Sequence, residues 1–168
     1  MNIRDRVKEF RRVPANELRP HPNNWRVHPK PQMDAIRGIL AEVGFAGAEL
    51  CRELPDGSLM LIDGHARAEI MGNEEIPCLV LDVDEAEANK LLLTFDPIGA
   101  MAEANRVQLD ALMRTVDTGN EAIEKMVKEL GESVGLYVVP DFQPVGIDQQ
   151  GRLDEKAKHT CPECGCEF

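Results

Sequence analysis

Apolar and polar positions along the chain form blocks that predict strands and helices in turn. Residues 13–18 fit a short strand, and residues 48–54 and 58–62 fit two strands joined by Pro55-Asp56-Gly57, in which proline fixes φ and glycine accepts a positive φ. The strongly apolar stretch 76–83 fits a buried strand. The pattern therefore predicts four strands, two of which form a hairpin.

Helices are predicted where apolar residues recur every three or four positions. The first begins near Pro31 and ends at Gly44, and a short second helix opens at Asp63-Gly64. A third follows the capping residue Asp84 and stops before Pro97, because proline lacks the N–H group that a helix interior needs. The faces expected to be buried are Ile36, Ile39, Leu40 and Val43 in the first helix and Ala88, Leu91, Leu92 and Phe95 in the third.

Two further helices, separated by Gly119 and ended by Gly131, are expected to form a helical hairpin. Their apolar faces are Leu109, Leu112, Met113 and Val116 in one helix and Ile123, Met126, Val127 and Leu130 in the other. The acidic side chains on these helices would repel DNA, which argues against a helix pair that reads DNA bases.

The elements together predict an α+β fold, with a small mixed sheet flanked by helices and a helical hairpin after it. The expected parts of the chain are a basic N-terminal segment (1–12), an α+β domain (13–96), a helical extension (97–137), a linker (138–158) and a Cys-rich tail (159–168).

Charge is distributed unevenly along the 168 residues, which carry a net charge of −11. Residues 1–37 hold nine Lys or Arg and four Asp or Glu, whereas the remaining residues hold 10 basic and 26 acidic side chains. The whole surface is therefore a poor match for DNA phosphates. The basic N-terminal segment is either a contact for the phosphates of DNA or of a nucleotide, or an ordinary solvated face.

The chain shows no apolar run long enough to span a membrane, and its start does not resemble a signal peptide. Its cysteines do not suggest a secreted disulfide framework, so we expect a cytoplasmic protein. Cys51 and Cys78 lie in predicted apolar strands and are interpreted as small buried thiols.

A turn between a strand and a helix, Asp63-Gly64-His65-Ala66-Arg67, is the main candidate for chemistry. A helix that starts beside a glycine presents unpaired N–H groups to an anion, and an arginine adds a fork of two hydrogen bonds to phosphate oxygens. His65 offers a further donor. Asp63 either orders the turn or simply caps the helix, and Arg26 either reaches the same phosphates from its loop or pairs with an acidic neighbour.

These residues, in this order, resemble the ParB/sulfiredoxin superfamily over about Val13 to Phe95. The resemblance rests on the strand 13–18, the Asn24-Trp25-Arg26 loop, the helix to Val43, the apolar strand pair, Leu61 to Arg67, Ile76-Pro77 and the segment from Asp82 to Leu93. The stretch 92–102 looks most like the ParB-like proteins encoded by phages and near DNA methyltransferase genes.

The resemblance implies that Gly64, His65 and Arg67 bind the phosphates of a nucleoside triphosphate, CTP or ATP with Mg²⁺. Sulfiredoxin activity is not expected, because His65 stands where those enzymes have a cysteine nucleophile. Ala66 stands where the CTP-hydrolysing ParB proteins have a further arginine, and no helix-turn-helix domain is evident in the chain.

Phosphotransfer is the most specific enzymatic alternative, since free serine kinases of this superfamily have a similar Asp-Gly-His turn. Such chemistry needs a carboxylate near the attacking hydroxyl, and Asp63 and Glu17 are the candidates. The loop after Leu18 lacks the glutamate that a kinase would place there. No cluster of carboxylates with metal-site spacing favours a nuclease.

The C-terminal segment contains a second motif, with Cys161, Cys164 and Cys166 following His159. The Cys-Pro-x-Cys-Gly spacing is typical of zinc knuckles, and His159 and Cys166 would complete a tetrahedral set within one chain. Alternatively, two chains would each supply Cys161 and Cys164 and form a homodimer. The interpretation is a structural zinc site, with an unmetallated reactive tail as the alternative.

The leading hypothesis from the sequence is a nucleotide-binding ParB-like module in phage or mobile-element DNA metabolism. An NTP-dependent phosphotransferase, NTPase or nuclease at the same turn is the enzymatic alternative. A third possibility is a non-catalytic adaptor that binds a protein partner.

Overall fold

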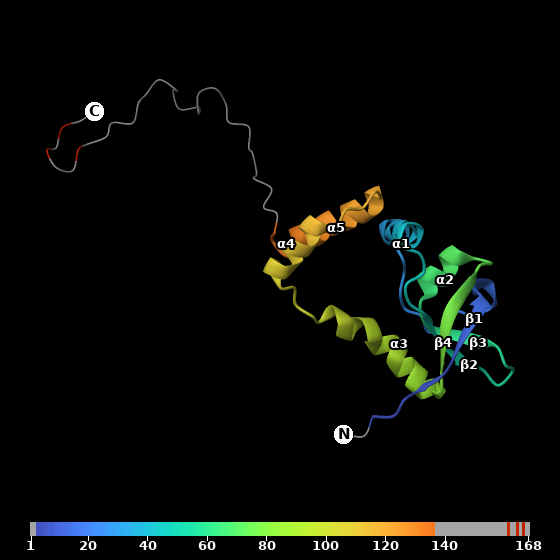
Figure 1. Cartoon of the computed structure of the whole chain (residues 1–168). Helices are drawn as coiled ribbons and strands as arrows, with labels where there is room; N and C mark the ends of the chain where they lie inside the picture. The colour runs from blue at the N-terminus through green and yellow to red at the C-terminus, as the bar shows by residue number, and fades with distance from the viewer. Residues whose placement is uncertain (1–2, 137–160, 162–163, 165, 167–168) are drawn as a thin grey trace. The chain divides into compact units, whose positions relative to one another are not determined.

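The computed structural model describes residues 3–136 together with Cys161, Cys164 and Cys166 (Figure 1). The described part has a mixed α+β architecture, as the sequence predicts. Its elements are β1 (Val7–Pro14), a 3-10 helix (Ala15–Glu17), α1 (Lys30–Glu42), β2 (Glu49–Glu53), β3 (Leu59–Asp63), α2 (His65–Met71), β4 (Glu75–Leu81), α3 (Glu85–Ala100), α4 (Arg106–Thr115) and α5 (Glu121–Ser133).

The four strands form one sheet in the order β1-β4-β2-β3. The predicted hairpin is confirmed, with β2 and β3 antiparallel and Gly57 at φ +81° in the connecting turn. β4 pairs parallel to β2 and antiparallel to β1, so the sheet is mixed. This order places β3, which leads into α2, at one edge.

The first strand lies earlier than the sequence pattern predicts. β1 covers Val7–Pro14, and Ala15–Glu17 form a 3-10 helix instead of continuing the strand. Much of the segment expected to be a basic N-terminal appendage is therefore an edge strand of the sheet. The prediction failed because β1 is an edge strand that is open to solvent and carries many charged residues. These residues obscure the alternation of apolar and polar positions by which a strand is recognised.

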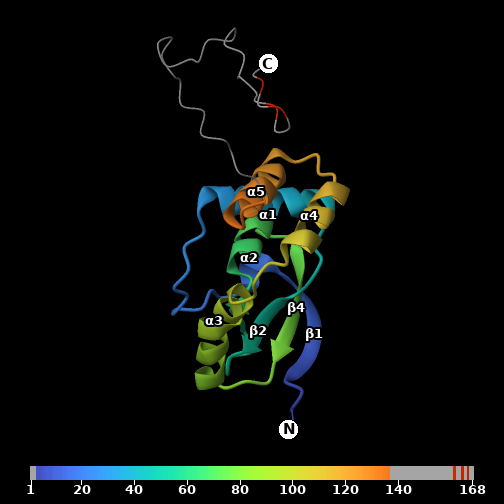
Figure 2. The same ribbon diagram turned by 90° about the vertical axis from the view of Figure 1, so that its left-hand side faces the viewer.

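Two apolar clusters hold the fold together. One joins the sheet to α2 and the 3-10 helix, and the other joins β3 to α3. Cys51 and Cys78 are fully buried in the first cluster, where their mutual hydrogen bond and, after it, burial raise the pKa of Cys51. The position of α1 between α2 and α5 is visible in both views (Figures 1 and 2).

Helix α3 continues through Pro97, contrary to the prediction that it stops before this residue. The Asp84 capping box begins the helix as predicted, and Ala88 and Leu92 are buried. Phe95 was expected in the buried stripe but is 52% exposed. The second half of α3, from Leu93 onward, is exposed, so water can reach the carbonyl of Leu93 that Pro97 leaves without a helical partner.

The helical hairpin of α4 and α5 is present, but its apolar faces are only partly covered. Ile123 is buried, whereas Leu112, Val116, Met126 and Leu130 are exposed. Ile39 and Val43 of α1 are also exposed, contrary to the expected face. Gly131 does not end α5, which runs to Ser133 with Gly131 buried inside it.

An open groove with a volume of about 830 Å³ lies between α1 and α5 and has a mostly apolar lining that includes Ile36, Ile39 and Met126. It accounts for part of the exposed apolar surface on these two helices.

Most of the basic side chains near the N-terminus have acidic partners. Of the nine Lys and Arg within residues 3–37, eight form ion pairs within 4 Å, namely Arg4, Arg6, Lys8, Arg11, Arg19, Arg26, Lys30 and Arg37. These side chains therefore pair within the chain in this structure, and the choice between a phosphate contact and an ordinary solvated face for the N-terminal segment stays a prediction. Separately, none of the helices in the described residues is both long and apolar enough to cross a membrane.

Candidate functional site

The turn predicted to carry chemistry joins the end of β3 to the start of α2. Gly64 is the N-terminal capping residue of α2 and has φ +98° and ψ 15°, a left-handed conformation that glycine adopts without strain. Within the part of the chain that the structure describes, no side-chain hydrogen bond caps this end of the helix. The sequence prediction of a strand, a glycine turn and a short helix is therefore confirmed.

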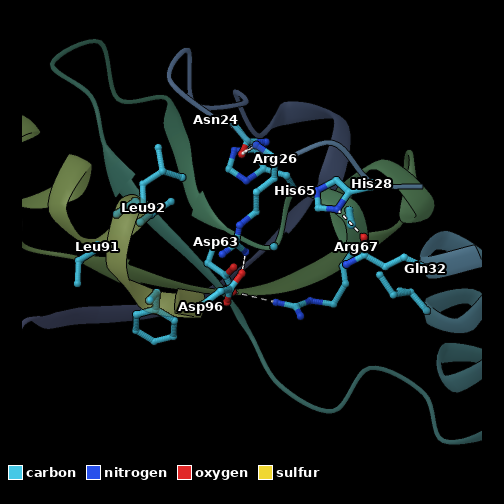
Figure 3. A pocket seen from close by; sticks show the side chains of 15 residues that line it. Asn24, Arg26, His28, Gln32, Asp63, His65, Arg67, Leu91, Leu92 and Asp96 are labelled. Carbon is cyan, nitrogen blue, oxygen red and sulfur yellow. Dashed lines mark hydrogen bonds and ion pairs between the residues drawn. The ribbon is translucent and has the colours of Figure 1, made fainter. Parts of the chain in front are cut away.

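A pocket with a volume of about 140 Å³ lies against this turn (Figure 3). Its walls come from the turn, the Pro-rich loop before α1, α1 itself and α3. The lining residues are Asn24, Arg26, His28, Gln32, Ile36, Ile62, Asp63, Gly64, His65, Ala66, Arg67, Leu91, Leu92, Phe95 and Asp96. The structure thus brings Asp63, Gly64, His65, Arg67 and Arg26 to one pocket.

Arg67 is held by an ion pair that the sequence analysis did not anticipate. Its Nε and Nη2 atoms donate to the two carboxylate oxygens of Glu49 at 2.8 and 2.7 Å. The side chain of Glu49 is 0% exposed, whereas that of Arg67 is 38% exposed. Burial raises the pKa of Glu49 and Arg67 opposes the rise, while the bond to Glu49 raises the pKa of Arg67.

Gly64 makes room for this ion pair. A β-carbon on residue 64 would overlap the Oε2 atom of Glu49. The absence of a side chain at position 64 therefore serves two purposes, the left-handed turn and the close approach of the Glu49 carboxylate to the backbone.

Asp63 does not cap α2, so that alternative is wrong. Its Oδ2 atom instead accepts a hydrogen bond from Nη2 of Arg67 at 3.3 Å. Together, Glu49 and Asp63 engage Nε and Nη2 of Arg67. Among the described residues, Nη1 is the nitrogen of Arg67 that takes no part in these bonds. Arg67 can therefore offer a ligand one nitrogen, and not the pair of nitrogens that a bidentate contact with phosphate would use.

His65 is oriented by the loop that precedes α1. The backbone N–H of His21 donates to Nε2 of His65 at 3.1 Å. Because Nε2 accepts, the proton of the neutral ring lies on Nδ1. Burial lowers the pKa of His65, which favours this neutral ring. His65 can therefore donate to a phosphate only through Nδ1.

Arg26 pairs with an acidic neighbour in this structure, which is one of the two alternatives left open by the sequence. Its guanidinium contacts the carboxylate of Asp96 on α3, and it also lies 5.1 Å from the centre of the Trp25 ring. Arg26 faces the pocket together with Asp96 (Figure 3).

Glu17 is not part of this site. Its side chain is exposed on the 3-10 helix and does not line the pocket, so the structure does not bring it together with Asp63.

The charges around the pocket nearly cancel. Two arginines and two aspartates line it, and Glu49 adds a negative charge behind Arg67. A polyphosphate therefore needs either a divalent cation or the release of an arginine from its carboxylate partner.

The Cys-rich tail is described only at Cys161, Cys164 and Cys166. The backbone N–H of Cys161 donates to the carbonyl of Cys166 at 2.9 Å, and hydrogen bonds from the Cys166 backbone and the neighbouring thiols lower the pKa of Cys164. His159 and the linker 138–158 lie outside the described residues. Within those residues, no group of three or more His, Cys, Asp or Glu could hold a metal ion, and the zinc site stays a prediction.

Comparison with known proteins identifies the fold. No protein-family model matches the sequence, and no curated protein matches it. The C-terminally truncated chromosome-partitioning protein ParB from Caulobacter crescentus, complexed with CTP-gamma-S, aligns with a TM-score of 0.51 at 18% identity, over 76% of this chain and 71% of that one. The chain therefore has a ParB-like fold.

Two further solved structures align less closely. The same Caulobacter protein complexed to the centromeric parS site gives a TM-score of 0.43 at 18% identity, over 74% of this chain and 68% of that one. A Pnob8-like ParB-N domain gives a TM-score of 0.45 at 17% identity, over 78% and 51%.

Proposed function

We propose that this chain is a nucleotide-binding ParB-like module that holds the phosphates of CTP or ATP at the Gly64 turn. One observation carries the proposal, namely that Arg26, His65 and Arg67 converge on a single pocket beside the turn. A solved protein with the same fold was complexed with CTP-gamma-S, which supports a nucleotide rather than another anion.

The size of the pocket supports a phosphate site in particular. Drug-sized ligands occupy pockets of about 300–1,000 Å³, whereas this one has about 140 Å³. The phosphates would enter the pocket, and the sugar and base would lie outside it. Nη1 of Arg67, Nδ1 of His65 and the guanidinium of Arg26 are the donors with which the chain would hold them.

Magnesium fits the same proposal. Asp63 offers a carboxylate oxygen that Arg67 does not engage, and Mg²⁺ is commonly held by one or two carboxylates together with phosphate oxygens. The cation would neutralise phosphate charge in a pocket that lacks a net positive charge. Asp63 is then a ligand candidate rather than a general base.

The biological setting of this proposal is phage or mobile-element DNA metabolism, on the strength of the resemblance over residues 92–102. DNA contact by the N-terminal segment would require Arg4, Arg6, Lys8 and Arg11 to exchange their acidic partners for phosphates. Phosphotransferase, NTPase and nuclease activities are alternatives at the same pocket, and metal-dependent turnover of a bound nucleotide would distinguish the first two from simple binding.

A protein-binding adaptor is the second candidate, and the apolar groove between α1 and α5 is the observation that favours it. An adaptor function predicts no nucleotide affinity at the Gly64 turn.

Calorimetric titration of the full chain with CTP, ATP and GTP in the presence of Mg²⁺ tests the proposed function. Arg26→Gln should weaken binding by at least tenfold, because it removes a charge-assisted hydrogen bond. Arg19→Gln is the matched control, since Arg19 lies in the same loop, pairs with Asp56 and does not line the pocket. Equal affinity in all three proteins, or no affinity in any, would contradict the proposal.

A further inference from the structure

The two arginines of the pocket are paired in very different ways. Arg67 is bound by two parallel hydrogen bonds to a fully buried carboxylate, and its partner Glu49 belongs to a central strand of the sheet. Arg26 is bound by Asp96, whose side chain is 47% exposed. An ion pair that is accessible to water exchanges its partners at far lower cost than a buried one.

Asp96 also belongs to the least supported part of α3. Every residue from Leu93 to Ala100 is exposed, and Pro97 follows Asp96 directly. Because proline has no N–H group, the carbonyl of Leu93 lacks its usual helical hydrogen bond. Few contacts therefore oppose withdrawal of the Asp96 side chain from Arg26.

Arg26 itself is better fixed than its partner. Its backbone N–H donates to Oδ1 of Asn24 at 3.3 Å, and its guanidinium lies over the Trp25 ring. The Arg26 side chain is 25% exposed. The guanidinium would consequently stay at the pocket when Asp96 leaves, and would be available to another anion.

We infer that Asp96 sets the affinity of the pocket by competing with ligand phosphate for Arg26. This inference rests on the proposed nucleotide-binding function. A phosphate group offers Arg26 the same bidentate geometry as a carboxylate and more negative charge, so it replaces Asp96 once the ligand enters. In the ligand-free protein, Asp96 therefore occupies the place that ligand phosphate would take on Arg26. Arg67 keeps its bonds to Glu49 both before and after the ligand binds.

The consequence is a site that binds phosphate more weakly than its arginines alone would allow. As the ligand enters, the Arg26–Asp96 pair must break, and the displaced Asp96 carboxylate, which is still part of the pocket wall, repels the phosphates. Neutralising Asp96 removes both penalties while keeping nearly the same side-chain shape.

Asp96→Asn in the full chain tests this inference, with calorimetric titration of CTP and ATP in the presence of Mg²⁺. The variant should bind about fivefold more tightly, which is the scale of a partly exposed ion pair. Asp110→Asn is the matched control, because Asp110 also pairs with an arginine on a helix but does not line the pocket. The gain should disappear in Arg26→Gln/Asp96→Asn.

The outcomes separate the inference from the function on which it rests. If the original chain binds nucleotide and Asp96→Asn binds equally or more weakly, the competition is wrong and the nucleotide site stands. If neither protein binds nucleotide, the proposed function fails and the inference fails with it.

Discussion

The carboxylate of Glu49 occupies the space in which a β-carbon on residue 64 would lie. Gly64 is therefore required by the buried ion pair of Arg67 as well as by the left-handed backbone that it adopts. Gly57 and Gly64 separate these effects, since Gly57 has a similar φ of +81° but, among the described residues, no atom lies within 4 Å of the β-carbon that it would carry.

Gly64→Ala should destabilise the protein far more than Gly57→Ala. A left-handed alanine costs about 1–2 kcal/mol, and this is the whole expected loss at position 57. At position 64 the methyl group also displaces Glu49 from Arg67, which brings the loss to at least about 3 kcal/mol. Urea unfolding measures both values, and equal losses would show that Glu49 does not need the space.

Arg67→Ala should cost about 3–5 kcal/mol of unfolding free energy, because it leaves the buried Glu49 carboxylate without a partner. Glu49→Gln/Arg67→Ala should recover part of this loss, since the stranded charge is then absent. Arg37→Ala, which breaks an exposed pair with Asp34, is the control and should cost less than about 1 kcal/mol. A loss at Arg67 as small as that at Arg37 would refute the buried pair. Such destabilisation also makes Arg26 a better position than Arg67 for testing nucleotide binding.

The turn should lose stability in mild acid. Burial lowers the pKa of both His65 and His21 from the ordinary value of 6.5. A histidine with a depressed pKa stabilises the fold fully above the unfolded value and loses that contribution as the pH falls through the folded value. Protonation of His65 would also place a proton on Nε2, which then could no longer accept the N–H of His21.

The free energy of unfolding should therefore fall between pH 7.5 and pH 5, and it should fall less in His65→Gln. NMR titration of the His65 ring provides the direct check. A pKa at or above 6.5, or a neutral ring protonated on Nε2, would be incompatible with the arrangement described.

Local sequence signals were sufficient for much of the fold and for part of the site. The hairpin, the buried strand β4, the glycine turn and the cap of α3 all depend on residues close together in the chain. Arg67, His65 and Arg26, which line one pocket, could be named from the sequence because they lie in or near such local motifs. The continuation of α3 through Pro97 was missed because proline lacks the N–H group that bonds to residue i−4 and so usually ends a helix, and no residue beside Pro97 signals that this helix continues.

Glu49, by contrast, depends on strand register. Cys51 pairs with Leu61, but the register shifts by one residue so that Leu50 pairs with Asp63. This bulge brings Glu49 to Gly64 and Arg67, and the residues around it contain no signal that predicts a bulge. The one sequence feature that could have indicated a role for Glu49 is its position as an acidic residue at the start of an apolar strand. The partnership of Asp96 with Arg26 is similarly long-range, because it joins the loop before α1 to α3.

The central claim, that phosphates bind at the Gly64 turn, is tested most directly by mapping the ligand on the full chain. Amide resonances of uniformly ¹⁵N-labelled protein would be followed by NMR during titration with CTP or ATP and Mg²⁺. The account predicts that the largest shifts occur at residues 63–67 and 24–28, with smaller shifts near Asp96. Saturable shifts confined to the groove between α1 and α5, or no shifts at millimolar nucleotide, would contradict it.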